Sequence, residues 1–161
     1  CEGEDTTIEK VVGDLLIKNN LKISTAESCT GGMIASRLVS ISGISDAFLE
    51  GAVTYSNEAK VRTLNVKEET LKKYGAVSEE TAREMAEGIA KRTGSDIAVV
   101  TTGIAGPGGG TEEKPVGLVY IGLYYKGEVF AYKNVFNGNR QEVRTKATVR
   151  ALDIVRRKIM Y

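Results

Sequence analysis

Ser28 has the sequence surroundings of a catalytic nucleophile. It follows an apolar segment that we expect to be a strand, and four small residues come directly after it, Cys-Thr-Gly-Gly at 29–32. Small residues let a ligand approach the backbone closely, and the first N–H groups of a helix lack internal partners and favour negative charge. Ser28 would then have oxyanion donors within reach. On this spacing alone, a capping role for Ser28 or Thr30 is the commoner outcome.

The base for such a serine cannot be a histidine, because the chain has none. That absence excludes a Ser-His-Asp triad, a Cys-His dyad and a histidine-based metal site within the chain. A desolvated lysine is the best remaining base. Tyr55 ends an expected strand and Lys60 lies on the helix that follows, so both can reach the carboxyl edge of a sheet. A solvated lysine and a tyrosine that only packs are the competing interpretations.

A glycine-rich segment follows a buried strand late in the chain. Five of the eight residues at 103–110 are glycines, which suits close contact between backbone and ligand. It is not a phosphate-binding P-loop, because no Gly-Lys-Ser/Thr follows, and it is not a dinucleotide fingerprint, because the next expected element is a strand. A binding loop and a flexible connector both remain open.

Arg140 and Arg144 form a pair on the last expected helix. Their i,i+4 spacing puts them on one face, next to the apolar stripe. Two guanidinium groups there suit a phosphate or a carboxylate. Solvated surface charge is an equally good interpretation, since the same helix also carries Arg150, Arg156 and Arg157.

The elements that position these residues alternate between helix and strand. We expect helices at 5–20 (with a capping box at 6–9), 33–39, 57–64, between the N-cap Ser78 and the stop Gly94, and 139–159. Strands are expected at 21–26, 48–54, 97–102, 116–125 and 128–136, the last two as a hairpin. This order favours an α/β fold, as a single three-layer domain with a mixed β-sheet flanked by helices.

Composition places the chain among ordinary globular proteins. It has 161 residues, 42% of them hydrophobic and 27% charged, with a formal net charge of +1. The near balance of charge argues against nucleic acid or a membrane surface as a partner. Two cysteines, Cys1 and Cys29, are too few for a disulfide framework and fit a cytoplasmic protein. Because the chain opens at Cys1 rather than Met, we expect a fragment or a processed form of a longer protein.

Six segments together resemble the CinA C-terminal domain family, also known as the nicotinamide-nucleotide amidase family. They occur in the family's order over roughly residues 8–158. The matching segments are 25–32, 51–60, 75–79, 103–109, 114–117 and 136–140. The resemblance implies an amidohydrolase that converts nicotinamide mononucleotide into nicotinic acid mononucleotide and ammonia. It also implies Ser28 as the nucleophile, Lys60 as its base with Tyr55 assisting, no cofactor or metal, and a homo-oligomer.

The binding roles are our inference from residue type. We expect backbone N–H groups near 29–32 to hold the oxyanion, the glycine loop to approach the nucleotide, and Arg140 or Arg144 to bind its phosphate. The expected substrate-binding residues are Thr30, Gly31, Gly32, Thr102, Gly103, Ala105, Gly106, Arg140 and Arg144.

Two other interpretations stay open. Cys29 could be the nucleophile, with Lys60 and Glu27 in a nitrilase-like Glu-Lys-Cys arrangement. Alternatively, the chain could be a non-catalytic pyridine-nucleotide-binding module linked to competence or DNA-damage responses, because membership of a fold family does not settle catalysis. Some relatives also carry an N-terminal domain resembling molybdopterin-cofactor binding proteins, which this chain lacks.

Overall fold

A five-stranded mixed β-sheet forms the centre of the computed structural model, which describes residues 6–161. Its spatial order is β2-β1-β3-β4-β5, with β2, β1 and β3 parallel and β4 and β5 antiparallel to their neighbours. The strands are β1 Ile23–Glu27, β2 Phe48–Val53, β3 Ile97–Gly103, β4 Leu118–Tyr125 and β5 Glu128–Val135. Cys1 and the expected helix start at residue 5 lie outside the described residues.

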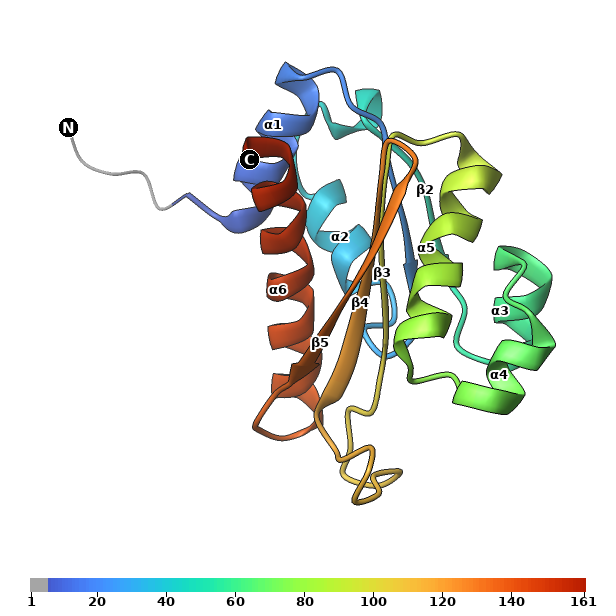
Figure 1. The fold of residues 1–161 in the computed structure, drawn as a ribbon. Helices are drawn as coiled ribbons and strands as arrows, with labels where there is room; N and C mark the ends of the chain where they lie inside the picture. The colour runs from blue at the N-terminus through green and yellow to red at the C-terminus, as the bar shows by residue number, and fades with distance from the viewer. Residues whose placement is uncertain (1–5) are drawn as a thin grey trace.

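Helices cover both faces of the sheet (Figure 1). On one face α6 packs against α1 and α2, and on the other α5 packs on the sheet with α3 and α4 outside it. The helices are α1 Ile8–Lys18, α2 Met33–Val39, α3 Asn57–Leu64, α4 Glu68–Tyr74, α5 Glu79–Thr93 and α6 Arg140–Met160, with a 3-10 turn at Ile44–Asp46. The predicted three-layer α/β fold with a mixed sheet is therefore confirmed.

The periodic apolar positions are the ones that face the sheet. The apolar stripe of α6 is buried throughout: Val143, Ala147, Ala151, Ile154 and Val155. The same holds for the apolar stripe of α5, formed by Ala82, Met85, Ala86 and Ile89. Burial of these stripes fixes how both long helices lie on the sheet.

Three local predictions differ from the structure. The side chain that caps α1 belongs to Thr7, which accepts from the Lys10 N–H at 3.3 Å, so a simple N-cap at Thr7 replaces the expected capping box at 6–9. Helix α4 is an element that the sequence pattern did not predict, because its seven residues carry little apolar periodicity. It is held from α5 instead, where Glu84 accepts from the Thr70 hydroxyl at 2.6 Å and from the Lys67 N–H at 2.9 Å.

The third difference is that two strands begin two residues later than predicted. Strand β1 covers Ile23–Glu27 rather than 21–26. Strand β4 begins at Leu118 rather than at residue 116, because residues 115–117 turn back against the glycine loop, with the Gly117 N–H bonded to the Ile104 carbonyl at 2.7 Å.

The parallel strands create one functional edge. Since β1, β2 and β3 run the same way, their carboxyl ends lie together, and ligand sites in open α/β sheets usually lie at such ends. Ser28 follows β1, Tyr55 lies two residues beyond β2, and Thr102 is near the end of β3. The long loop after β3 projects beyond this edge, at the bottom of Figure 1.

Candidate active site

Ser28 and Lys60 meet at the carboxyl edge of the sheet. The Lys60 Nζ lies 3.2 Å from the Ser28 Oγ, although the two residues are far apart in the sequence. The backbone of Ser28 is fixed to the neighbouring strand, because its N–H donates to the Thr101 carbonyl at 3.1 Å. Both predicted catalytic side chains are thus brought into hydrogen-bond contact.

Lys60 is a buried amine without an acidic partner. Its side chain comes from α3 and is only 1% exposed. The Nζ donates to the backbone carbonyls of Thr54 at 2.8 Å and Tyr55 at 3.2 Å. Among residues 6–161 no carboxylate forms an ion pair with it. Burial without a counter-charge favours the neutral amine, and the pKa of Lys60 is accordingly lowered from its ordinary value.

Three oxygens surround the Lys60 Nζ: the Thr54 carbonyl, the Tyr55 carbonyl and the Ser28 Oγ, and the amine donates to all three when it is protonated. A neutral amine has two N–H donors and one lone pair. If the two carbonyls take the two donors, the lone pair faces the Ser28 hydroxyl, which can then donate its proton along the 3.2 Å contact. A serine nucleophile with a lysine base needs such a contact.

Tyr55 contributes to the site in two separate ways. Its backbone carbonyl accepts from Lys60, whereas its side chain is 64% exposed at the rim. The phenolic oxygen accepts from the Arg140 Nη2 at 3.4 Å. The structure therefore brings the Tyr55 backbone, and not its hydroxyl, to the Ser28–Lys60 pair.

The turn that carries Ser28 is held by buried polar contacts. The Thr30 hydroxyl lies 2.5 Å from Glu27 Oε1 and 2.8 Å from the Thr101 hydroxyl. The carboxylate of Glu27 also accepts from the N–H groups of Ile34 at 2.9 Å and Ala35 at 3.1 Å, at the start of α2. Thr30 therefore supports the turn from inside the protein rather than facing a ligand.

Glycines at 31 and 32 let this turn close. Their φ angles are +58° and +99°, a region that side-chain-bearing residues rarely adopt. A Cβ on Gly31 would also lie 3.2 Å from the Arg144 Nη2. Neither glycine lines the cavity beside Ser28, so the structure gives them a role in chain geometry instead of the expected substrate contact.

A cavity of about 330 Å³ opens beside Ser28 and Lys60. This is near the lower end of the range for small-molecule sites. The predicted residues that line it are Ser28, Tyr55, Lys60, Thr102, Gly103, Ala105, Gly106 and Arg140. Two larger hollows along α3, of about 630 and 590 Å³, contain none of the predicted site residues.

One wall of this cavity was missed by the sequence interpretation. Ala76 and Val77, between α4 and α5, line it together with the glycine loop. The Thr102 hydroxyl holds this segment by donating to the Ala76 carbonyl at 2.7 Å. The signal available was the family segment at 75–79, in which Ser78 was interpreted as a helix cap and Ala76 and Val77 have no reactive side chain.

The two arginines of the predicted pair have different surroundings. Arg140 lines the cavity and donates to the Gly106 carbonyl at 2.9 Å. Arg144 does not line it. Its Nε donates to the Cys29 carbonyl at 2.9 Å, and its Nη2 donates to the Thr30 carbonyl at 3.4 Å. Only Arg140 is therefore placed to meet a ligand, and the structure does not place Arg144 as a phosphate-binding residue.

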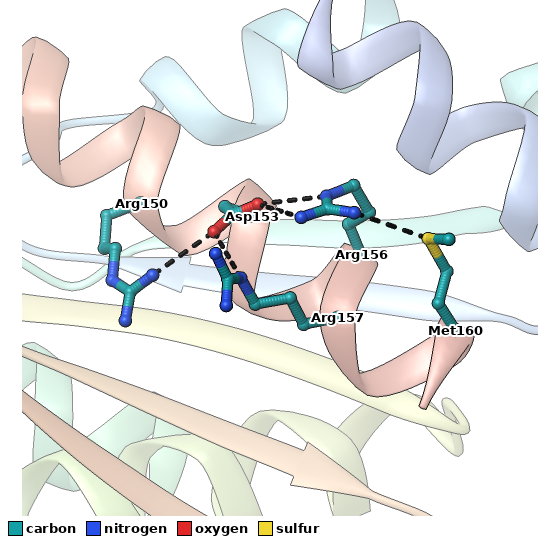
Figure 2. A network of polar contacts seen from close by, with 5 residues as sticks. All are labelled: Arg150, Asp153, Arg156, Arg157 and Met160. Carbon is teal, nitrogen blue, oxygen red and sulfur yellow. Dashed lines mark hydrogen bonds and ion pairs between the residues drawn. The ribbon is translucent and has the colours of Figure 1, made fainter.

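The other arginines of α6 belong to a surface network (Figure 2). Arg150, Arg156 and Arg157 all donate to the carboxylate of Asp153, at 2.8–3.2 Å. Partial burial favours the neutral form of Asp153, but the hydrogen bonds from Arg156 and Arg157 outweigh it and lower the pKa of the carboxyl group. These three arginines are occupied away from the cavity.

Cys29 is poorly suited to be the nucleophile. Burial raises the pKa of its thiol to about 11, so the reactive thiolate is scarce at neutral pH. Glu27, the third member of the alternative triad, is engaged by Thr30 and the start of α2 rather than by Lys60. The geometry therefore favours Ser28 over Cys29.

Neither a metal cluster nor a membrane span is found in the part of the chain that the structure describes. Within residues 6–161 no three His, Cys, Asp or Glu side chains gather where they could hold a metal ion. No helix in the same range is both long enough and apolar enough to cross a membrane.

Comparison of sequences finds close relatives among clostridia. The chain is 64% identical over 154 residues to a Clostridium beijerinckii protein described as competence-damage inducible. It is 57% identical over 155 residues to a protein of the same description from Clostridium botulinum strain Langeland. Each alignment covers 96% of this chain but 38% of the relative. The chain thus spans well under half the length of the curated relatives it matches.

Solved structures share the whole fold. A competence/damage inducible protein from Agrobacterium tumefaciens is 39% identical, with a TM-score of 0.90 and complete coverage of both chains. A CinA superfamily protein from Klebsiella pneumoniae is 34% identical with a TM-score of 0.91, covering 96% of this chain and 99% of that one. A family model described as the CinA C-terminal domain matches residues 5–159. The chain therefore belongs to the CinA C-terminal domain family.

Proposed function

We propose that this chain is a serine amidohydrolase that converts nicotinamide mononucleotide into nicotinic acid mononucleotide and ammonia. The observation that carries the proposal is the contact between the Ser28 hydroxyl and the buried amine of Lys60, which no carboxylate pairs among residues 6–161. Acyl transfer needs a nucleophile, a base and an oxyanion site. The resemblance to nicotinamide-nucleotide amidases supplies the substrate, and the site geometry supports the chemistry.

The acylation half of the reaction uses one proton twice. Ser28 Oγ attacks the carboxamide carbon, and its proton moves to the neutral Lys60 amine as the new C–O bond forms. When the tetrahedral intermediate collapses, the C–N bond breaks and the Lys60 ammonium returns the proton to the leaving nitrogen, which departs as ammonia. Ser28 is then an ester of the nicotinic acid group.

Deacylation repeats the sequence with water. Lys60 takes a proton from a water molecule as that water attacks the ester carbonyl, and it returns the proton to Ser28 Oγ as the ester bond breaks. The carboxylic acid product and the free serine result.

Arg140 is the residue best placed for the substrate phosphate. It lines the cavity, and no carboxylate pairs with it among residues 6–161. Its bonds to the Gly106 carbonyl and the Tyr55 hydroxyl hold the guanidinium over the glycine loop. A phosphate bound there would leave the nicotinamide ring to reach toward Ser28.

The test is ammonia release from nicotinamide mononucleotide by metal-free protein, with Ser28→Ala measured alongside. Turnover that disappears in the variant would support the serine amidase. Saturable binding of the nucleotide without ammonia release would instead support the non-catalytic binding module. Cys29→Ser serves as the matched neighbour: lost activity in this variant and full activity in Ser28→Ala would overturn the assignment of the nucleophile.

A further inference from the structure

We propose that Arg144 is a positioning residue that aligns and polarises the Cys29 N–H as an oxyanion donor. The inference rests on the proposed acyl-transfer chemistry at Ser28. It assigns Arg144 a role in transition-state stabilisation, in place of the phosphate contact expected from its spacing with Arg140.

The backbone N–H that follows the nucleophile is the donor concerned. Cys29 lines the cavity next to Ser28, and among residues 6–161 its N–H donates to no backbone carbonyl; its hydrogen-bond partner is the thiol of its own side chain. A donor directly after the nucleophile lies close to the carbonyl that the nucleophile attacks. Its orientation depends on the planar peptide group that it shares with the Ser28 carbonyl.

That peptide group is the end of a short relay that starts at Arg144. The Arg144 Nη2 donates to the Thr30 carbonyl at 3.4 Å. The same peptide group carries the Gly31 N–H, which donates to the Ser28 carbonyl at 3.1 Å. The Ser28 carbonyl in turn shares a peptide group with the Cys29 N–H. In a trans peptide the C=O and N–H point in opposite directions, so each contact constrains the orientation of the next donor along the relay.

The second contact of Arg144 fixes the turn from its other side. Its Nε donates to the Cys29 carbonyl at 2.9 Å, so one planar guanidinium grips two successive carbonyls. A lysine has a single donor centre and cannot reproduce this fork. The guanidinium packs closely over Gly31, where a Cβ would be 3.2 Å from Nη2.

The charge of Arg144 is available to the relay. Its polar contacts among residues 6–161 are the two carbonyls and the neutral amide oxygen of Gln141, at 3.1 Å, and none is a carboxylate. A cation at the start of a hydrogen-bond chain polarises the following peptide groups and strengthens the last donor. The Cys29 N–H would stabilise the developing oxyanion more than the ground-state carbonyl, which is the condition for raising kcat.

The test compares Arg144→Met with Arg150→Met on the full chain. Arg150 lies on the same helix but pairs with Asp153 away from the cavity (Figure 2). Removing an oxyanion donor costs about 10²–10³ in kcat. Because the Cys29 donor stays but loses its alignment, we expect kcat to fall about 10- to 100-fold in Arg144→Met, with KM and the pH inflection unchanged. Arg150→Met should match wild type.

A reagent that does not depend on the nucleotide separates this proposal from the substrate assignment. When a fluorophosphonate reacts with the enzyme, Ser28 Oγ forms a bond to phosphorus and fluoride leaves. The serine proton passes to Lys60. Negative charge develops on the phosphoryl oxygen during this step, so the reaction depends on the same oxyanion donors. Intact-mass spectrometry gives the rate of adduct formation, which we expect to fall about 10- to 100-fold in Arg144→Met. The fall should be smaller in Arg144→Lys, which keeps the positive charge. The lysine variant also serves as the test if Arg144→Met does not fold.

The outcomes are distinguishable. A folded Arg144→Met or Arg144→Lys protein that reacts at the wild-type rate overturns the positioning role, and so does a loss confined to KM. Wild-type labelling of Ser28 without ammonia release refutes the nucleotide substrate, while the rate ratio still decides the role of Arg144. A wild-type chain that forms no adduct at Ser28 overturns both.

Discussion

Replacing Lys60 by methionine should abolish catalysis at a smaller cost in stability than replacing it by alanine. Methionine is close to the lysine stem in length and fills the buried volume, but it leaves the Thr54 and Tyr55 carbonyls without their Nζ donor, a loss of about 0.5–1.5 kcal/mol for each hydrogen bond. Lys60→Ala leaves a cavity at a site that is 1% exposed, and the corresponding cost is about 2–5 kcal/mol. Both variants should lose at least the 10²–10⁴-fold in kcat typical of a missing general base.

Two measurements check this prediction together. Urea denaturation gives the stability of each variant, and ammonia release from nicotinamide mononucleotide gives its kcat. If Lys60 is the base, the two variants differ in stability and share the same loss of activity. A Lys60→Met enzyme that keeps more than a tenth of the wild-type kcat would refute the assignment of Lys60 as the base.

The pH profile provides an independent check. Burial lowers the pKa of Lys60, and only the neutral amine can accept the Ser28 proton, so kcat/KM should rise with pH through an inflection below 10.5, the ordinary lysine value. The unfolded chain binds more protons at this residue than the native chain between the native pKa and 10.5. Wild-type stability should therefore rise with pH in that window relative to Lys60→Met, and a flat difference would contradict a depressed pKa.

Three further perturbations have expected outcomes. Cys29→Ser should keep its activity within a few-fold in the ammonia assay, because the thiol, with a pKa of about 11, stays protonated; a loss comparable to Ser28→Ala would restore the cysteine mechanism. Arg140→Met should raise KM for the mononucleotide about 10- to 100-fold, which corresponds to the loss of a charged hydrogen bond of about 1.5–3 kcal/mol. The KM for the nucleoside nicotinamide riboside, which has no phosphate, should not change. Equal increases in KM for both compounds would exclude a phosphate contact. Asn139→Ala removes the capping box of α6 and should lower the free energy of unfolding by about 0.5–2 kcal/mol in urea titration, without changing kcat.

The layered fold was predictable because its signals are local and periodic. Apolar spacing placed α5 and α6, and buried runs placed the central strands. Helix α4 lacked such a signal. Its position depends on Glu84 of α5, which accepts hydrogen bonds from the Thr70 hydroxyl and the Lys67 N–H although it lies in a later helix of the chain. A pattern within seven residues cannot contain that information.

The site was predictable to the extent that its chemistry comes from reactive side chains. Residue type made Ser28 and Lys60 candidates, the family resemblance selected them over a helix cap and a solvated lysine, and the structure brings them together. The contribution of backbone groups could not be predicted from the sequence. Lys60 is held by the backbone carbonyls of Thr54 and Tyr55, and every residue has such a carbonyl. Arg140 lines the cavity whereas Arg144 binds backbone carbonyls, because the 28–32 turn passes next to Arg144. The spacing of the two residues on α6 contains no information about the path of that turn.

The long sequence distances across the site have a consequence for folding. Arg144 and the Cys29 carbonyl are 115 residues apart, and Lys60 reaches Ser28 from 32 residues away. Contacts of such high sequence separation form only after the intervening chain has closed large loops. A nascent or partly unfolded chain thus contains an ordinary serine and an ordinary, protonated lysine. On the proposed function, nucleophilic reactivity at Ser28 would be a property of the completely assembled domain, and its recovery during refolding would report the closure of these long-range contacts.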